Sequence, residues 1–245
     1  MSALSGKCAL ITGAASGFGA GIAARFVAEG ARVVIADINA SGARTQADAL
    51  GDAASWVEMD VSCDHSVADA VASISNPIDI LVNNAGIGHH PQPLTELSEA
   101  DFDRLFAVNM KSVFLTARHF VPIMTRTGSA ILNIASTAGV SPRPGLTWYN
   151  ASKGWMITAT RSMAVELAAN GIRVNALNPV AGETPLLATF LGEDTPERRA
   201  EFLATIPLGR FSTPADLGAA ACYLCSDDAA MITGVTLEVD GGRCI

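Results

Sequence analysis

Residues 8–19 read Cys-Ala-Leu-Ile-Thr-Gly-Ala-Ala-Ser-Gly-Phe-Gly, an apolar run followed by three closely spaced glycines. The run predicts a strand over Cys8–Thr12, and the residues after it predict a helix over Gly19–Glu29. Glycines at a strand-to-helix turn let the backbone approach a pyrophosphate, and the helix N-terminus supplies unpaired N–H groups. A plain glycine-rich turn is the alternative, but the position after the first strand favours a dinucleotide site. The expected contacts are Gly13, Ser16, Gly17, Phe18 and Gly19.

Short apolar runs alternate with longer helical patterns along the rest of the chain. Most runs are apolar on both faces, which is typical of parallel strands covered on both sides. The alternation predicts an α/β fold, with one Rossmann-like, doubly wound parallel sheet of about seven strands and helices on both faces. The expected strands are Cys8–Thr12, Arg32–Ala36, Trp56–Met59, Ile78–Val82, Ala130–Ala135, Arg173–Leu177 and Val235–Val239. The expected helices are Gly19–Glu29, Ala40–Leu50, Val67–Ile74, Glu99–Met124, Ala151–Ala169 and Pro214–Cys225.

One segment, residues 182–208, interrupts this alternation. It carries a helical pattern between Pro185 and Ala204 and is bounded by Pro185 and Pro207. Ligands bind at the carboxyl edge of doubly wound sheets. We therefore expect a single dinucleotide-binding catalytic domain over residues 1–245, in which 182–208 is a helical insertion that covers the substrate.

An acidic residue follows the second predicted strand. Asp37 lies eighteen residues after Gly19, where a carboxylate can accept hydrogen bonds from the adenosine ribose hydroxyls and would repel a 2′-phosphate. Ile38 and Asn39 come next, so no arginine or lysine is placed there to receive that phosphate. Asp37 and Ile38 therefore predict NAD(H) as the cofactor, with a plain turn residue as the alternative for Asp37.

The amino-acid composition limits the kinds of partner that the protein is expected to bind. The chain has 245 residues, of which 49% are hydrophobic, and a net charge of −8, which argues against nucleic acid because phosphate-binding surfaces are usually basic. No apolar run reaches the roughly 20 residues that span a membrane. Five cysteines, an odd number scattered along the chain, indicate a reduced, cytoplasmic protein.

No metal site is expected. Cys222 and Cys225 form a CxxC within an apolar helical stretch, where buried packing is the simpler interpretation. His89 and His90 are adjacent and lack a convergent carboxylate, which makes them poor ligands.

A serine, a tyrosine and a lysine in the second half of the chain indicate the chemistry. Ser136 ends an apolar run, Tyr149 follows thirteen residues later, and Lys153 follows Tyr149 by four. A tyrosine and a lysine at i and i+4 of a helix lie on one face, one turn apart. The free phenol has a pKa of about 10, and a nearby positive charge favours its ionised form. The pair can therefore act as an acid/base near neutral pH.

Together these residues resemble the short-chain dehydrogenase/reductase family, in the subgroup with TGxxxGxG and YxxxK motifs. The resemblance covers essentially the whole chain. The motifs that carry it are Thr12-Gly13-x-x-x-Gly17-x-Gly19, Asp60-Val61, Asn83-Asn84-Ala85-Gly86, Asn109, Ser136, Tyr149-x-x-x-Lys153 and Asn178-Pro179.

The resemblance implies an enzyme that transfers a hydride between a nicotinamide and a carbinol carbon. It implies that Tyr149 is the acid/base, that Lys153 lowers the tyrosine pKa and binds the nicotinamide ribose, and that Ser136 donates to the substrate oxygen. It also implies that Asn109 organises a water behind Lys153. For the cofactor it implies adenine contacts from Asp60 and Val61, and a ribose floor from Asn83, Ala85 and Gly86.

The chain departs from the family pattern after the sixth predicted strand, where the family usually has Pro-Gly. Here Pro179 is followed by Val180, and Thr184 stands at the offset of the family threonine that binds the nicotinamide carboxamide. We assign Pro179, Val180 and Thr184 to the cofactor site. Gly182 is expected to supply the conformational freedom that Val180 lacks.

The substrate is the least determined part. The expected lining is mostly apolar, and a secondary alcohol or ketone is the main interpretation. A 3-oxoacyl thioester reductase is the alternative, although Asp37 and the acidic balance disfavour it, and a sugar or polyol dehydrogenase is a third. Arg143 either points to solvent or is aimed at the pocket mouth by two flanking prolines, so we expect bulky neutral ketones ahead of anionic ones. The expected lining is Ala138, Arg143, Leu146, Trp148, Leu187, Phe190 and His90.

The long helices and the last strand carry more apolar residues than packing against one face of the sheet requires. The family resemblance implies a homotetramer with two-fold axes. The helices over Glu99–Met124 and Ala151–Ala169 would form one interface, and the terminal segment Val235–Ile245 another.

Overall fold

The structure is a computed structural model that describes residues 2–124 and 127–245. The described residues form a seven-stranded parallel sheet in the order β3-β2-β1-β4-β5-β6-β7, which confirms the predicted doubly wound α/β fold. The order reverses between β1 and β4, and such a switch point is where these sheets bind ligands. The strands are β1 (Cys8–Thr12), β2 (Arg32–Asp37), β3 (Ala54–Glu58), β4 (Ile80–Asn83), β5 (Ala130–Ile134), β6 (Arg173–Pro179) and β7 (Thr236–Val239).

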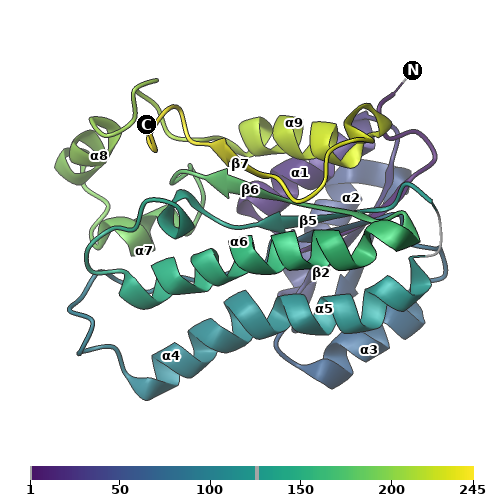
Figure 1. The fold of residues 1–245 in the computed structure, drawn as a ribbon, viewed down its shortest axis with the longest axis horizontal. Coiled ribbons are helices and arrows are strands. Elements are labelled where there is room, and N and C mark those ends of the chain that lie inside the picture. The colour runs from purple at the N-terminus through teal and green to yellow at the C-terminus, as the bar shows by residue number, and fades with distance from the viewer. Residues whose placement is uncertain (1, 125–126) are drawn as a thin grey trace.

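Helices cover both faces of the sheet (Figure 1). One layer comprises α1 (Gly17–Ala28), α2 (Ala40–Leu50) and α9 (Pro214–Cys225). The other comprises α3 (Asp64–Ser73), α4 (Glu99–Phe106), α5 (Ser112–Phe120) and α6 (Thr147–Leu167). Short 3₁₀ turns occur at Gly51–Ala53, Val121–Ile123, Thr137–Gly139, Ala168–Asn170 and Asp227–Ala229. None of the helices within the described residues is long and apolar enough to cross a bilayer.

The sheet divides the core into two main clusters because successive strand side chains point to opposite faces. In β1, Ala9 and Ile11 pack with α1, α2 and α9, whereas Cys8 and Leu10 pack with α3, α5 and α6. All five residues of β1 are buried. This burial explains why the run reads as apolar on both faces.

Two helices differ from their predicted bounds next to the site. The helix expected over Glu99–Met124 is divided into α4, a π-helical turn at Ala107–Lys111, α5 and a 3₁₀ turn. Apolar periodicity does not reveal a π turn, which is a single-turn irregularity within a helical pattern. The helix expected from Ala151 begins at Thr147, and no side chain caps that end, so the sequence carries no start signal there.

The segment that interrupts the alternation contains two short helices, α7 (Leu187–Leu191) and α8 (Pro196–Leu203). Both lie beyond the carboxyl ends of the strands (Figure 1). Gly182, where the segment begins, and Ser212, shortly after the segment ends, form a parallel β-bridge. The helices are therefore held over the edge of the sheet where the ligand is expected.

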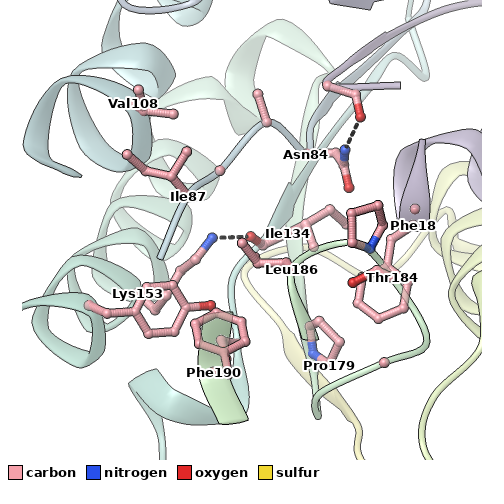
Figure 2. Close-up of a pocket in the computed structure, with 18 of the residues that line it drawn as sticks. Phe18, Asn84, Ile87, Val108, Ile134, Lys153, Pro179, Thr184, Leu186 and Phe190 are labelled. Atoms are coloured by element: carbon pink, nitrogen blue, oxygen red, sulfur yellow. Dashed lines mark hydrogen bonds between the residues drawn. The ribbon is translucent and has the colours of Figure 1, made fainter. Parts of the chain in front are cut away.

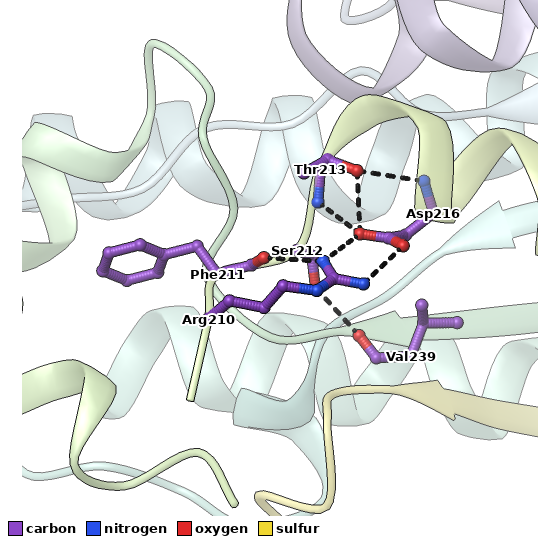
Figure 3. Close-up of polar contacts among 6 residues, drawn as sticks. All are labelled: Arg210, Phe211, Ser212, Thr213, Asp216 and Val239. Atoms are coloured by element: carbon purple, nitrogen blue, oxygen red, sulfur yellow. Dashed lines mark hydrogen bonds and ion pairs between the residues drawn. The ribbon is translucent and has the colours of Figure 1, made fainter. Parts of the chain in front are cut away.

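A polar cluster fixes the chain where it leaves this segment (Figure 3). Asp216, in the first turn of α9, accepts hydrogen bonds from both Nη atoms of Arg210, at 2.6 and 2.8 Å, and forms a capping box with Thr213. Bonding to Arg210 first, and then to Thr213, holds the pKa of Asp216 well below its usual range. Ser212 Oγ donates to the carbonyl of Val239 at 3.1 Å. The exit of the segment is thus tied to both α9 and β7.

Candidate active site

A cavity of about 630 Å³ opens at the carboxyl ends of the strands and gathers most of the predicted site residues (Figure 2). Those that line it are Gly13, Ser16, Gly17, Phe18, Asp37, Ile38, Asp60, Val61, Ala85, Gly86, Ser136, Ala138, Arg143, Tyr149, Lys153, Pro179, Val180, Thr184, Leu187 and Phe190. Those that do not are Gly19, Asn83, His90, Asn109, Leu146 and Trp148.

The predicted acid/base group lies at the middle of this cavity. Tyr149 is in the first turn of α6, Lys153 is one turn further on, and Ser136 follows β5. All three are at least nine-tenths buried. Lys153 Nζ donates to the carbonyl of Ile134 at 2.9 Å and lies 5.9 Å from the centroid of the Tyr149 ring. The geometry therefore brings the phenol, the ammonium and the serine hydroxyl to one point.

Burial dominates the electrostatics of this group. It raises the pKa of Tyr149 to about 12, an effect that hydrogen bonding with Ser136 and the charge of Arg143 oppose. Burial also lowers the pKa of Lys153 to about 8. The groups that lower the tyrosine pKa in this structure are Ser136 and Arg143, and the lowering expected from Lys153 stays a prediction.

Asn109 has a different environment from the expected one. It is fully buried in the π turn, where its Oδ1 accepts from the N–H of Ile87 at 2.9 Å. Its Nδ2 donates to the Ile87 carbonyl at 3.0 Å and to Ser152 Oγ at 3.1 Å. Asn109 therefore fixes the backbone beside Gly86, where a Cβ would lie 3.4 Å from both Asn109 Oδ1 and Lys153 Nζ. Its role in a water relay stays a prediction.

The glycine turn has the shape that a pyrophosphate requires. Gly13 and Gly17 have φ values of 62° and 58°, in the left-handed region that favours glycine. A Cβ on Gly13 would lie 2.8 Å from Ala85 Cα. Ser16, the N-cap of α1, makes no side-chain capping hydrogen bond, so its side chain leaves the first N–H groups of the helix to a ligand.

Asn84, a member of the Asn83-Asn84-Ala85-Gly86 motif, bonds to the backbone of the glycine turn. Its Nδ2 donates to the carbonyls of Thr12 and Gly13, at 2.8 and 2.9 Å, and one of these two hydrogen bonds is drawn in Figure 2. A Cβ on Gly19 would lie 2.5 Å from the same nitrogen. Gly19 is therefore needed for this close approach and not for contact with the cavity.

Asp37 stands at the other end of the cavity. Its Oδ2 accepts from the N–H of Ala15 at 3.0 Å, and its Oδ1 accepts from the N–H of Asn39 at 2.9 Å. A carboxylate has about four acceptor positions, so both oxygens keep capacity for a ribose hydroxyl. Its neighbour Ile38 is 66% exposed. The glycine turn, α1 and Asp37 fit a dinucleotide.

The comparisons with known proteins agree with this geometry. A family model described as "Enoyl-(Acyl carrier protein) reductase" matches residues 13–243. A 4-formylbenzenesulfonate dehydrogenase of Comamonas testosteroni is 47% identical over 251 residues, which cover 99% of each chain. The chain belongs to the short-chain dehydrogenase/reductase family.

Two further relatives show the range of this family around the chain. A galactitol 2-dehydrogenase of Agrobacterium fabrum is 41% identical over 253 residues, covering 98% of each chain. A crystal structure described as a 3-ketoacyl-(acyl-carrier-protein) reductase from Brucella melitensis complexed with NADH is 50% identical, with a TM-score of 0.93, and covers 99% of this chain and 100% of that one. The protein is therefore an NAD(P)-dependent oxidoreductase that acts on CH–OH groups.

In this short-chain dehydrogenase the side chain of Asn83 faces away from the cofactor cavity. Its Nδ2 donates to Asn133 Oδ1 at 2.8 Å, and its Oδ1 accepts from Thr116 Oγ1 at 2.8 Å. Asn133 Nδ2 in turn donates to Thr160 Oγ1 at 2.9 Å. This buried network joins β4 and β5 to α5 and α6, so Asn83 supports the cavity from behind.

The departure from the family pattern at Val180 is accommodated without strain. Val180 is 2% exposed, its N–H donates to the Val239 carbonyl at 3.2 Å, and its φ is negative. Gly182 also has a negative φ, so the expected conformational freedom is not what it provides. A Cβ there would lie 2.2 Å from Phe18 Cζ. Gly182 is required because it packs against the Phe18 ring, and Figure 2 shows this ring beside Thr184.

Three residues of the expected substrate lining lie elsewhere. Leu146 is buried behind the wall. Trp148 packs edge-on against Phe102, with centroids 5.6 Å apart, and its Nε1 donates to the carbonyl of Leu94. His90 is exposed and outside the cavity. The helix start at Thr147 explains the first two, since it sets a register that the sequence did not mark.

The wall of the dehydrogenase cavity also contains residues that sequence reasoning missed. Phe202, from α8, lines it together with Phe190. The guanidinium of Arg143 lies 4.9 Å from the Phe202 ring centroid, and that of Arg243 lies 5.1 Å from it. Sequence signals for these contacts are absent, because the three positions are far apart along the chain. Among the described residues, no three His, Cys, Asp or Glu side chains are grouped as a metal site would need.

Proposed function

We propose that the protein interconverts a secondary alcohol and its ketone, with NAD(H) as the hydride carrier. The observation that supports this most directly is that the acid/base residues and the dinucleotide-binding residues meet in one cavity. Ser136, Tyr149 and Lys153 line the same cavity as the glycine turn after β1 and Asp37 after β2. Acid/base groups beside a dinucleotide cradle are the arrangement that hydride transfer to a carbonyl needs.

The choice of NAD(H) over NADP(H) rests on Asp37. Its carboxylate is held between the N–H groups of Ala15 and Asn39, which fixes a negative charge where a 2′-phosphate would lie. The basic residues that line the cavity are Arg104, Arg143 and Lys153, and none is adjacent to Asp37 in sequence. The related Brucella structure is described as a complex with NADH.

The proposed roles follow from the positions of the side chains. Tyr149 takes the hydroxyl proton in oxidation and returns it in reduction. Ser136 donates to the substrate oxygen and holds it beside the phenol. Lys153, which is fixed by the Ile134 carbonyl, supplies positive charge as the phenolate forms. Bound NAD(H) would supply the hydride chemistry.

The cavity wall beyond Tyr149 favours a ring-bearing substrate. Ala138, Leu187 and Phe190 line it, and the Phe190 ring lies 4.8 Å from that of Tyr149. Burying apolar surface there is worth about 25 cal/mol per Å². The substrate in the name of the Comamonas relative, 4-formylbenzenesulfonate, has a benzene ring, which supports a ring-bearing substrate here. The segment with α7 and α8 then covers the substrate, because it supplies Leu187, Phe190 and Phe202.

Two alternatives follow from the other relatives. The Brucella structure, described as a 3-ketoacyl-(acyl-carrier-protein) reductase, supports a thioester substrate, but the net charge of −8 disfavours docking of an acidic carrier protein. The galactitol 2-dehydrogenase supports a polyol substrate, but the apolar wall offers few hydrogen bonds to several hydroxyls.

The chain contains two tyrosines, which makes a matched test possible. Tyr149→Phe is expected to keep NADH binding and to lose about a hundredfold or more in kcat, the scale of general acid–base catalysis. Tyr223→Phe is the control, because Tyr223 is 46% exposed on α9. The substrate for this test is identified first, by measuring turnover of ring ketones and alcohols with NAD(H) and with NADP(H). Near-normal kcat in Tyr149→Phe would disprove the assignment.

A further inference from the structure

One cation on the wall of the substrate cavity has no obvious structural task. Arg143 lies in the loop that precedes α6, between Pro142 and Pro144. The loop is fixed at two points: Asn150 Nδ2 donates to the Arg143 carbonyl at 2.8 Å, and the Gly145 carbonyl accepts from the N–H of Gln92 at 3.0 Å. The backbone of Arg143 is therefore held in place, and its side chain lines the cavity.

The guanidinium of Arg143 contacts only aromatic faces in the described chain. It lies 4.9 Å from the centroid of Phe202 and 5.8 Å from that of Phe190, and no carboxylate or carbonyl of the described residues bonds to it. Other arginines do have such partners. Arg210 is bound by Asp216, and the buried Arg173 donates to three backbone carbonyls.

A second cation increases the positive potential at this place. Arg243 also lies against Phe202, so the two guanidinium groups contact the same ring. Burial first, and then the charge of Arg243, lower the pKa of Arg143. Two like charges without a carboxylate partner repel each other, and an anion bound beside them would relieve this cost.

The acids of the region do not fill this position. Among the residues that line the cavity, the acidic ones are Asp37 and Asp60, both of which belong to the adenosine end. Glu193 and Glu201 border an outer hollow next to Arg143, and Glu201 is bound by Arg198 at 3.3 Å. The substrate end of the cavity thus presents a cation without an acid.

The position of Arg143 relative to the reacting group sets the length of a fitting ligand. The Phe190 ring is close to both groups, since its centroid lies 4.8 Å from that of the Tyr149 ring and 5.8 Å from the Arg143 guanidinium. A molecule with one six-membered ring between its reacting carbon and an acid group can pass along Phe190 and reach both.

We infer that the substrate carries a carboxylate or sulfonate at the end opposite its reacting carbon, and that Arg143 binds this oxyanion. A guanidinium presents a planar fork of N–H donors that matches two oxygens of either group. Arg243, which contacts the same Phe202 ring, adds positive potential. This inference rests on the proposed function and replaces the sequence-based expectation of a neutral ketone.

The test compares 4-acetylbenzoate and 4-acetylbenzenesulfonate with the neutral 4-acetylbenzamide. In reduction with NADH, the parent is expected to favour the two anions over the amide by about ten- to a hundredfold in kcat/KM, the range of one charged hydrogen bond. Arg143→Met is expected to remove this preference, measured within each variant as the ratio of the kcat/KM values for the anions and the amide, and Arg143→Lys to keep part of it. The control is Arg161→Met, because Arg161 is exposed on α6.

Calorimetric titration of the same three compounds into each variant with saturating NADH separates binding from turnover. Binding of the anions that is lost in Arg143→Met supports the inference even where no compound is reduced, which would count against the proposed function alone. Reduction of the amide as fast as the anions, or an anion preference that survives in Arg143→Met, overturns the inference and leaves the proposed function intact.

Discussion

Lys153→Met tests the claim that the acid/base group is held at a cost to the fold. The buried ammonium has a pKa lowered from 10.5 to about 8 by desolvation. At pH 7 this corresponds to roughly 3 kcal/mol lost by the native state, since one pKa unit is worth about 1.4 kcal/mol. Methionine has a similar length and no charge, but it gives up the hydrogen bond to Ile134, worth about 1.5–3 kcal/mol. The free energy of unfolding of the variant at pH 7 should therefore be about 1 kcal/mol higher than that of the parent, although the variant loses activity.

The pH dependence of the difference is the sharper result. Below pH 8, Lys153 is charged in both states, so the native state carries the full desolvation cost. Between pH 8 and 10.5 only the unfolded state binds the proton, and unfolding becomes less favourable as pH rises. The free energy of unfolding of the parent should rise by roughly 2 to 3 kcal/mol relative to that of Lys153→Met between pH 7 and pH 10.

Urea denaturation of both proteins at four pH values and equal protein concentration measures this gain. The control is Lys111→Met, which removes the same charge from an exposed position and should follow the parent. Parallel curves for the parent and Lys153→Met would show that Lys153 carries no desolvation cost.

Three further predictions concern the cofactor, the packing of the loop and assembly. Asp37→Ser with Ile38→Arg should move the ratio of kcat/KM values from NAD(H) towards NADP(H), and a parent that already prefers NADP(H) would contradict the role of Asp37. Gly182→Ala places a Cβ 2.2 Å from Phe18 Cζ and should weaken NADH binding by about tenfold or more, a cost on the scale of overpacking, whereas Gly154→Ala, whose Cβ has ordinary contact distances, should not. Light scattering at micromolar concentration should give the mass of four protomers, and a monomer mass would refute the predicted tetramer.

The parts of this fold that the sequence predicted well depend on residues that are neighbours along the chain. Strand β1 and the glycine turn after it are consecutive, so alternation and glycine spacing describe them directly. The start of α6 at Thr147 was missed because Leu146, its N-cap, offers no capping side chain. The π turn around Asn109 was missed because it leaves the apolar pattern almost unchanged.

The candidate site divides along the same line. Tyr149 and Lys153 share one helix turn, so their spacing alone indicated a joint role. Arg143, Phe202 and Arg243 come together only because the segment with α7 and α8 folds over the sheet edge and the C-terminal residues pass beside it. Their contacts are tertiary, and a pattern read along one chain does not contain them.

The bridge between Gly182 and Ser212 has a consequence for how such an enzyme can diverge. The chain leaves the sheet and returns to it at one point, with the return secured by Arg210 and Asp216. What lies between is a closed excursion, and changing its length costs little closure entropy, about 0.6 kcal/mol for a doubling. Natural or engineered changes to the length and sequence of this segment can therefore alter which substrates the enzyme accepts. The sheet and its hydride-transfer residues would keep their stability.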